Sequence, residues 1–245
     1  MPKLSLREVF SVSSQSLHIQ IFLPFLIPML FYILITSFLF QYLSEGLLLF
    51  QTGEDVLRFV YQWSLYIILS LLIYLILTIF AFNLSSILLR DFATIGTKNY
   101  LSSIKEAFSK LLRVLFVNIM AFIVFLTGLL FYAVHPILLL MGFFLAPFFS
   151  FVSPSIIIDN LSSFKAIKNS IMLSLHYTLP SFILFIFSFF LLIGIPLSIS
   201  YLVYSLFSID LLGKFIIYGI PIIEMIFATY IAIFTTVAYL NYRGY

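Results

Sequence analysis

The stretch that decides the fold is residues 59–89, FVYQWSLYIILSLLIYLILTIFAFNLSSILL, which contains no charged residue. A membrane-spanning α-helix needs about 20 consecutive apolar residues, so this stretch is long enough to cross a bilayer. Residues 9–44, 114–158 and 169–209 are also free of Asp, Glu, Lys and Arg. These stretches are continuously apolar and lack the alternating ten-residue segments of a membrane β-barrel. The sequence therefore predicts an all-α integral membrane protein.

The composition supports this class. The 245 residues are 63% hydrophobic and only 9% charged, whereas about a quarter of the residues of a soluble domain are charged. With a net charge of only +3, nothing indicates a nucleic-acid partner. The chain has no cysteine, which excludes disulfides, thiol nucleophiles and thiolate metal sites.

We expect one multi-pass domain over residues 1–245, folded as a six-helix bundle. The stretch 114–158 is long enough for two helices, and His135-Pro136 supplies a polar break with a proline near its middle. The predicted spans are residues 20–42, 62–86, 114–134, 137–158, 179–204 and 215–240.

The cationic residues fix an orientation for this bundle. Six passes leave only Arg58 and Lys214 on one side, and the other side receives Lys3, Arg7, Arg90, Lys98, Lys105, Lys110, Arg113, Lys165, Lys168 and Arg243. Cytoplasmic loops are enriched in Lys and Arg, so both termini are expected in the cytoplasm of a prokaryotic cell. The first apolar stretch is too long for a signal peptide, and we expect it to be retained.

Three amphipathic segments precede predicted spans on the cytoplasmic side, at residues 6–17, 101–115 and 161–175. Apolar residues recur in them at helical spacing, which predicts helices that lie flat at the membrane interface. Ser5 with Glu8, and Ser103 with Glu106, have the spacing of a capping box. The three segments indicate either a repeated unit of interfacial helix and hairpin, or ordinary basic connectors. The expected head-group contacts are Arg90, Lys98, Lys105, Lys110, Arg113, Lys165 and Lys168.

Several short motifs resemble those of a broad prokaryotic group of six-helix membrane proteins. The group includes the membrane domain fused to some glycerophosphoryl diester phosphodiesterases and the uncharacterised YciC-type proteins. The motifs are Pro154-Ser155-Ile156-Ile157-Ile158-Asp159-Asn160, Ser162, Ala166-Ile167-Lys168 and Ser170, then Arg90-Asp91, Gly96, Lys98 and 103–107, then Tyr239-Leu240-Asn241-Tyr242-Arg243. The resemblance implies a membrane module that sometimes accompanies a lipid-metabolising domain. We expect no such soluble domain after Arg243, so phosphodiesterase activity is not carried over.

Glu224 is the one carboxylate inside a predicted span. It lies about 14 Å into the bilayer, counted from Phe215 at about 1.5 Å per residue. A charge at that depth costs several kcal/mol, so Glu224 is expected to face other helices. It either takes part in a proton, cation or head-group site, or is a neutral carboxyl bonded to Asn83, a tyrosine hydroxyl or a carbonyl.

The second predicted span carries hydroxyl groups at four-residue steps, at Tyr66, Ser70, Tyr74 and Thr78. Such a stripe either lines a polar path or makes hydrogen bonds between helices. Together with Glu224 and Asn83, these residues form the candidate intramembrane site. The three histidines fall on both sides of the membrane and cannot share one metal, and no hydrolase or phosphate-loop motif occurs.

The sequence thus predicts a membrane module without catalytic apparatus or cofactor. Its expected partners are membrane lipids, in particular anionic ones, and a membrane or cytoplasmic protein. A small transporter or lipid translocase that uses Glu224 is the first alternative, and an intramembrane enzyme is the second.

Overall fold

The computed structural model describes residues 4–47, 53–95, 100–132, 144–206 and 213–244, which form helices and turns and contain no strand. The elements are α1 (Leu6–Gln15), α2 (Ile19–Leu47), α3 (Gly53–Ile95), α4 (Tyr100–Tyr132), the 3-10 helix η1 (Ala146–Phe149), α6 (Val152–Ile157), α7 (Ser163–His176), α8 (Thr178–Phe189), the π-helix η2 (Phe190–Gly194), α9 (Ile195–Leu206), the π-helix η3 (Phe215–Gly219) and α11 (Ile220–Arg243).

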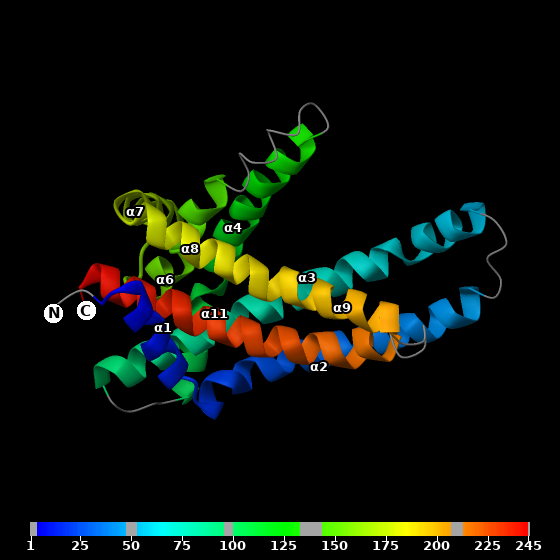
Figure 1. The fold of residues 1–245 in the computed structure, drawn as a ribbon, viewed down its shortest axis with the longest axis horizontal. Helices are drawn as coiled ribbons and strands as arrows, with labels where there is room; N and C mark the ends of the chain where they lie inside the picture. The colour runs from blue at the N-terminus through cyan, green and yellow to red at the C-terminus, as the bar shows by residue number, and fades with distance from the viewer. Residues whose placement is uncertain (1–3, 48–52, 96–99, 133–143, 207–212, 245) are drawn as a thin grey trace.

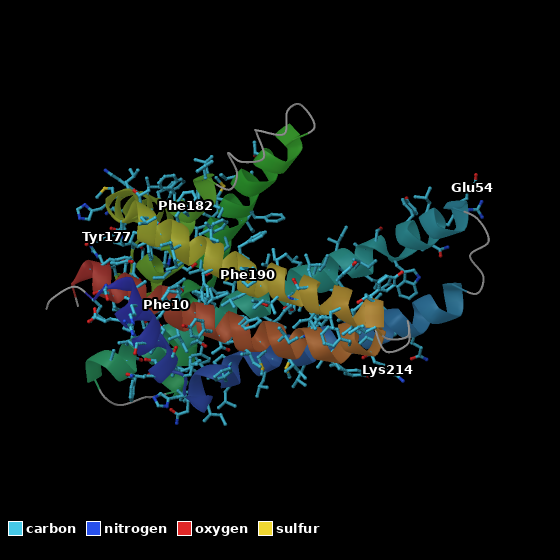
Figure 2. All side chains as sticks on the ribbon, viewed as in Figure 1. Phe10, Glu54, Tyr177, Phe182, Phe190 and Lys214 are labelled. Carbon is cyan, nitrogen blue, oxygen red and sulfur yellow. The ribbon has the colours of Figure 1, made fainter. Side chains whose placement is uncertain are left out.

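Five helical stretches in the described part are long and apolar enough to cross a membrane. They are Ile19–Leu39, Tyr61–Ala93, Tyr100–Val124, Thr178–Leu206 and Phe215–Arg243. Both chain termini lie at one end of the bundle, which we call the terminal end (Figure 1). Glu54 and Lys214 lie at the opposite, far end (Figure 2). The protein is therefore a multi-pass membrane protein.

The predicted span 137–158 differs from the structure in its described part. Residues 146–157 form η1 and the six-residue α6, joined through a turn, and residues 133–143 lie outside the described residues. Two serines of α7 bond backbone groups at this break. Ser170 accepts from the Phe151 amide at 3.1 Å and donates to the Phe148 carbonyl, while Ser174 donates to the Pro147 carbonyl.

Helix α4 is one continuous helix of 33 residues, so the prediction of a separate flat helix at residues 101–115 is wrong. The face of α4 that packs inward on α3 and α6 is made of small and polar residues as well as valines. Its buried members are Ser103, Ala107, Lys110, Val114 and Val117. The leucine-rich face points outward instead, because the interior of this bundle accommodates the smaller side chains at close helix contacts.

The core of the bundle lies along α11 near the terminal end. Residues 231–239 of this helix are all buried, and α1, α2 and α3 pack against it (Figure 1). Small hydroxyl residues allow the close approach, as where Thr236 donates to Ser86 of α3 at 2.9 Å. Ser85, the residue before Ser86 on α3, donates to the Ile21 carbonyl of α2.

Both π-helices occupy the same position in a repeated sequence, Phe-x-x-x-Gly-Ile-Pro, at residues 190–196 and 215–221. Proline lacks an amide hydrogen, and its ring clashes with the carbonyl four residues earlier. That carbonyl lies inside the π turn in each case, on Leu192 before Pro196 and on Ile217 before Pro221. The wider turn accommodates the clash.

The predicted capping box at Ser5 and Glu8 is confirmed, since each side chain bonds the backbone amide of the other residue. The hydrogen bonds from Ser5 lower the pKa of the exposed Glu8 carboxyl. The capping box predicted at Ser103 and Glu106 is wrong, because α4 already begins at Tyr100. Ser103 donates instead to Asp91 of α3.

Candidate functional site

Four charged side chains meet near the terminal end, where α3, α4 and the end of α6 converge. We call Arg90, Asp91, Glu106 and Lys110 the ion cluster. The Arg90 guanidinium bonds both Glu106 oxygens, at 2.7 and 2.8 Å, and Asp91 at 2.7 Å. Lys110 donates to Glu106 at 2.5 Å and to the Ile157 carbonyl at 2.6 Å. The cluster therefore joins two long helices to α6.

A second polar group ties the C-terminal helix to the turn after α6. Asp159 accepts from the Tyr239 hydroxyl at 2.7 Å and pairs with Arg243 at 2.6 Å. Asn169 of α7 donates to Tyr239 and to Ser155. These residues come from α11, from α7, from α6 and from the turn between α6 and α7. Their contacts fix the position of α7 on the bundle.

Asn160 has a backbone φ of 51°, in the left-handed region that Asn tolerates better than most residues. Its side chain accepts from Arg113 of α4 at 3.1 Å, and Arg113 also donates to the Leu161 carbonyl at 3.4 Å. The turn between α6 and α7 is thereby held against α4.

These contacts separate the predicted head-group residues into those bonded within the protein and those that are exposed. The expectation that Lys110 lies on an exposed polar face is wrong, since its side chain is only 6% exposed and its ammonium group is bonded inside the protein. Arg90 and Arg113 also bond protein groups. Lys98 lies outside the described residues. Lys105, Lys165 and Lys168 are exposed.

The three exposed lysines lie beside outward-facing apolar stripes. On α4, Leu101, Phe108 and Leu112 are 60–77% exposed. On α7, Phe164 is 75% and Leu175 is 60% exposed. Long cationic side chains next to such stripes keep their charge in the head-group layer while their stems contact hydrocarbon. This geometry suits the head-group layer of a membrane leaflet, with α7 as an interfacial helix.

Glu224, the carboxylate of the predicted intramembrane site, bonds a tyrosine. The Tyr74 hydroxyl of α3 donates to Glu224 at 3.1 Å, and the ring of Tyr32 on α2 lies 5.5 Å from the Tyr74 ring. Beside them lies a cavity of about 20 Å³, lined by residues of α2, α3 and α11. This volume holds about one water molecule.

Two larger cavities flank this small one, and the hydroxyl stripe of α3 connects the three. Tyr74 lines both the small cavity and one of about 190 Å³ that also contacts Ser70. Thr78 lines both the small cavity and one of about 330 Å³. The same order holds on α11, where Glu224 lines the small cavity and Thr235 the large one. Three cavities therefore follow one another along α3, each with a hydroxyl group in a mainly apolar wall.

The remaining predicted residues lie elsewhere. Tyr66 is 62% exposed toward the far end. Asn83 is completely buried, and neither of its side-chain polar atoms has a hydrogen-bond partner in the described structure. Of the alternatives for Glu224, the tyrosine hydroxyl is the partner observed, and Asn83 is not.

Sequence reasoning did not identify three polar residues of the large cavity, Asn118, Ser153 and Ser188. They come from α4, α6 and α8, and nothing in their spacing along the chain relates them. Only the packing of the helices brings them together.

Within the described residues, no group of three or more His, Asp or Glu side chains is placed to hold a metal ion. Comparison of the chain with protein-family models, curated proteins and solved structures finds no match. The resemblance to the six-helix prokaryotic group stays a prediction.

Proposed function

We propose that the protein is a six-pass module of a prokaryotic cytoplasmic membrane, with both termini in the cytoplasm and no catalytic apparatus. In this proposal it associates with anionic lipids through Lys105, Lys165 and Lys168. We further propose that it is of the same kind as the six-helix group that it resembles. Support for that kinship is that Arg90-Asp91, 154–160 and 239–243 converge near the terminal end.

The observation that carries the lipid proposal is the pairing of exposed lysines with outward-facing apolar stripes on α4 and α7. Arg90, Lys110 and Arg113 are engaged by protein groups, so the three lysines are the cations left for lipid phosphates on these two helices. Each cation near a charged leaflet contributes about 1 kcal/mol.

The test compares the binding of phosphatidylglycerol and phosphatidylcholine to the purified protein in detergent, by native mass spectrometry. Two lysines at about 1 kcal/mol each predict that Lys165→Gln/Lys168→Gln weakens phosphatidylglycerol binding roughly 30-fold. The matched control is Arg58→Gln/Lys214→Gln, which removes two cations from the far end. Equal binding of both lipids by the unaltered protein, or an equal loss in the control, would contradict the proposal.

A second candidate function is translocation of a proton, a small solute or a lipid past Glu224. The observation that favours it is the succession of three cavities along Ser70, Tyr74 and Thr78, with Glu224 at the narrowest one. Proton flux into proteoliposomes, followed with an enclosed pH dye, tests the simplest case. Glu224→Gln is expected to lower the flux, and Glu54→Gln, exposed at the far end, is not. Equal fluxes in all three proteins would exclude proton translocation through Glu224.

A further inference from the structure

Helix α4 diverges from the other long helices toward its C-terminal end (Figure 1). Val114 and Asn118 of this helix line the cavity of about 330 Å³. Its wall combines residues of α3, α4, α6, α8 and α11 with Phe149 and Ser150. Val117 is the last buried residue described on α4, and the helix beyond it exposes apolar side chains such as Ile119 and Phe122. The cavity therefore sits in a fork between α4 on one side and α8 and α11 on the other.

Polar atoms without protein partners lie in this wall. Ser188 Oγ of α8 is buried and has no hydrogen-bond partner in the described structure. Asn118 of α4 donates through Nδ2 to the Val114 carbonyl at 2.8 Å and to Ser153 Oγ at 3.3 Å. Among the described residues its Oδ1 remains available as an acceptor, and Ser153 still has its own hydroxyl hydrogen to donate. Donors and acceptors from three helices thus face one space.

A buried hydroxyl without a partner costs about 1–3 kcal/mol, so these atoms favour a ligand that bonds them. The lining includes no charged side chain, and residues 114–158 and 169–209 have none either. An ionic group would find no counter-charge here, and its burial would be unfavourable. The ligand is therefore uncharged and carries hydroxyl or carbonyl groups.

The rest of the wall is aliphatic and aromatic, with Phe82, Phe149, Leu184 and Phe185 among its residues. The volume lies at the lower end of the range of small-molecule sites, about 300–1,000 Å³. It can hold the polar part of a lipid with a short length of chain, and the remaining chain would lie in hydrocarbon against the exposed face of α4. Asn118 is eight residues past Lys110, or about 12 Å along the helix, so a lipid bound here has its polar part deeper than the head-group layer.

We infer that this cavity binds the hydroxyl and ester groups of an uncharged glyceride lipid, of which diacylglycerol is the simplest. Ser188, Asn118 and Ser153 bond the glycerol oxygens, and the acyl chains leave through the fork into the bilayer. This inference adds a second lipid class and a second binding place to the proposed lipid association. It does not depend on the three exposed lysines.

The test uses the full-length protein in phosphatidylcholine nanodiscs that contain a diacylglycerol with a photoactivatable group near its glycerol, with cross-linked peptides identified by mass spectrometry. The unaltered protein is expected to be labelled on α4, α6 and α8 around the cavity. Ser188→Phe fills the cavity and removes the Ser188 hydroxyl. It is expected to reduce this labelling at least roughly tenfold, because the loss of one hydrogen bond can already account for that factor. Ser205→Phe, the same change at an exposed serine of α9, is the matched control.

Asn118→Leu replaces the side-chain amide with an apolar group of the same branching and covers the case in which Ser188→Phe does not fold. Labelling that persists in Asn118→Leu, or an equal yield at these helices from a phosphatidylcholine probe, would overturn the inference. Phosphatidylglycerol binding by the same variants separates the two proposals. Loss of cavity labelling with intact phosphatidylglycerol binding supports this site. Retained cavity labelling with intact phosphatidylglycerol binding rejects it and leaves the lysine proposal in place.

Discussion

At the scale of single residues, two lysines five positions apart on α4 have opposite environments. Lys105 is exposed, whereas Lys110 is buried and donates to both Glu106 and the Ile157 carbonyl. The carbonyl bond matters as much as the ion pair, because Ile157 is at the end of α6 and its carbonyl has no following helical turn to bond it. Lys110 thus replaces a missing helix cap.

We predict that Lys110→Ala lowers the free energy of unfolding by about 1–3 kcal/mol. The change removes a buried donor to Glu106 and to the Ile157 carbonyl, and it leaves that carbonyl with the longer bond from Arg90 at 3.2 Å. Lys105→Ala, on the exposed side of the same helix, is expected to change it by less than about 0.5 kcal/mol. Thermal unfolding of both variants in one detergent measures the difference. Similar losses in the two variants would show that Lys110 contributes only ordinary surface charge.

At the scale of the helices, the π turns before Pro196 and Pro221 depend on a glycine covered by an aromatic ring. A Cβ atom at Gly194 would lie 2.7 Å from the Phe190 ring, and one at Gly219 would overlap the Phe215 ring. The ring folds back over the glycine one turn later in each case. The repeated Phe-x-x-x-Gly-Ile-Pro order is thus a local sequence signal for a widened turn.

Gly219→Ala is therefore predicted to destabilise the protein by about 1–3 kcal/mol through overpacking against Phe215. The double variant Phe215→Leu/Gly219→Ala is expected to recover part of this loss, because leucine can move away from the new methyl group. A double-mutant cycle that includes Phe215→Leu alone, measured by thermal unfolding, tests the coupling. Purely additive effects would argue against contact between the ring and residue 219.

At the scale of the whole molecule, the polar contacts concentrate at the end where both termini lie, and long apolar surfaces extend away from it. Helix α3 has 43 residues, or about 65 Å at 1.5 Å per residue, about twice the thickness of a hydrocarbon core. It therefore extends beyond the membrane, and in Figure 1 its N-terminal part projects past α9 together with the end of α2.

The absence of native cysteine allows a direct test of the proposed orientation. We predict that Arg58→Cys is labelled by a membrane-impermeant maleimide in intact cells, and that Lys168→Cys is labelled only after the membrane is opened. Both positions are exposed in the structure, so accessibility within the protein does not differ between them. The opposite pattern would place both termini outside the cell.

The sequence by itself determined the class of protein and the approximate position of most membrane helices, because continuous apolar stretches need no partner to be recognised. It also determined the capping of α1, since a capping box involves residues three apart. Periodicity predicted helices where α1 and α7 lie. In α4 the same pattern does not say whether the polar or the apolar side packs inward. Lys110 is the clearest case.

Only the tertiary structure decided which polar residues meet. Glu224 bonds Tyr74 and not Asn83, and Asn118, Ser153 and Ser188 share one cavity although they are distant in the chain. In a bundle of nearly uniform hydrophobicity, the rotation of each helix is set by close contacts of small residues, such as Thr236 of α11 with Ser86 of α3. Those contacts join helices far apart in sequence, so no local pattern encodes them.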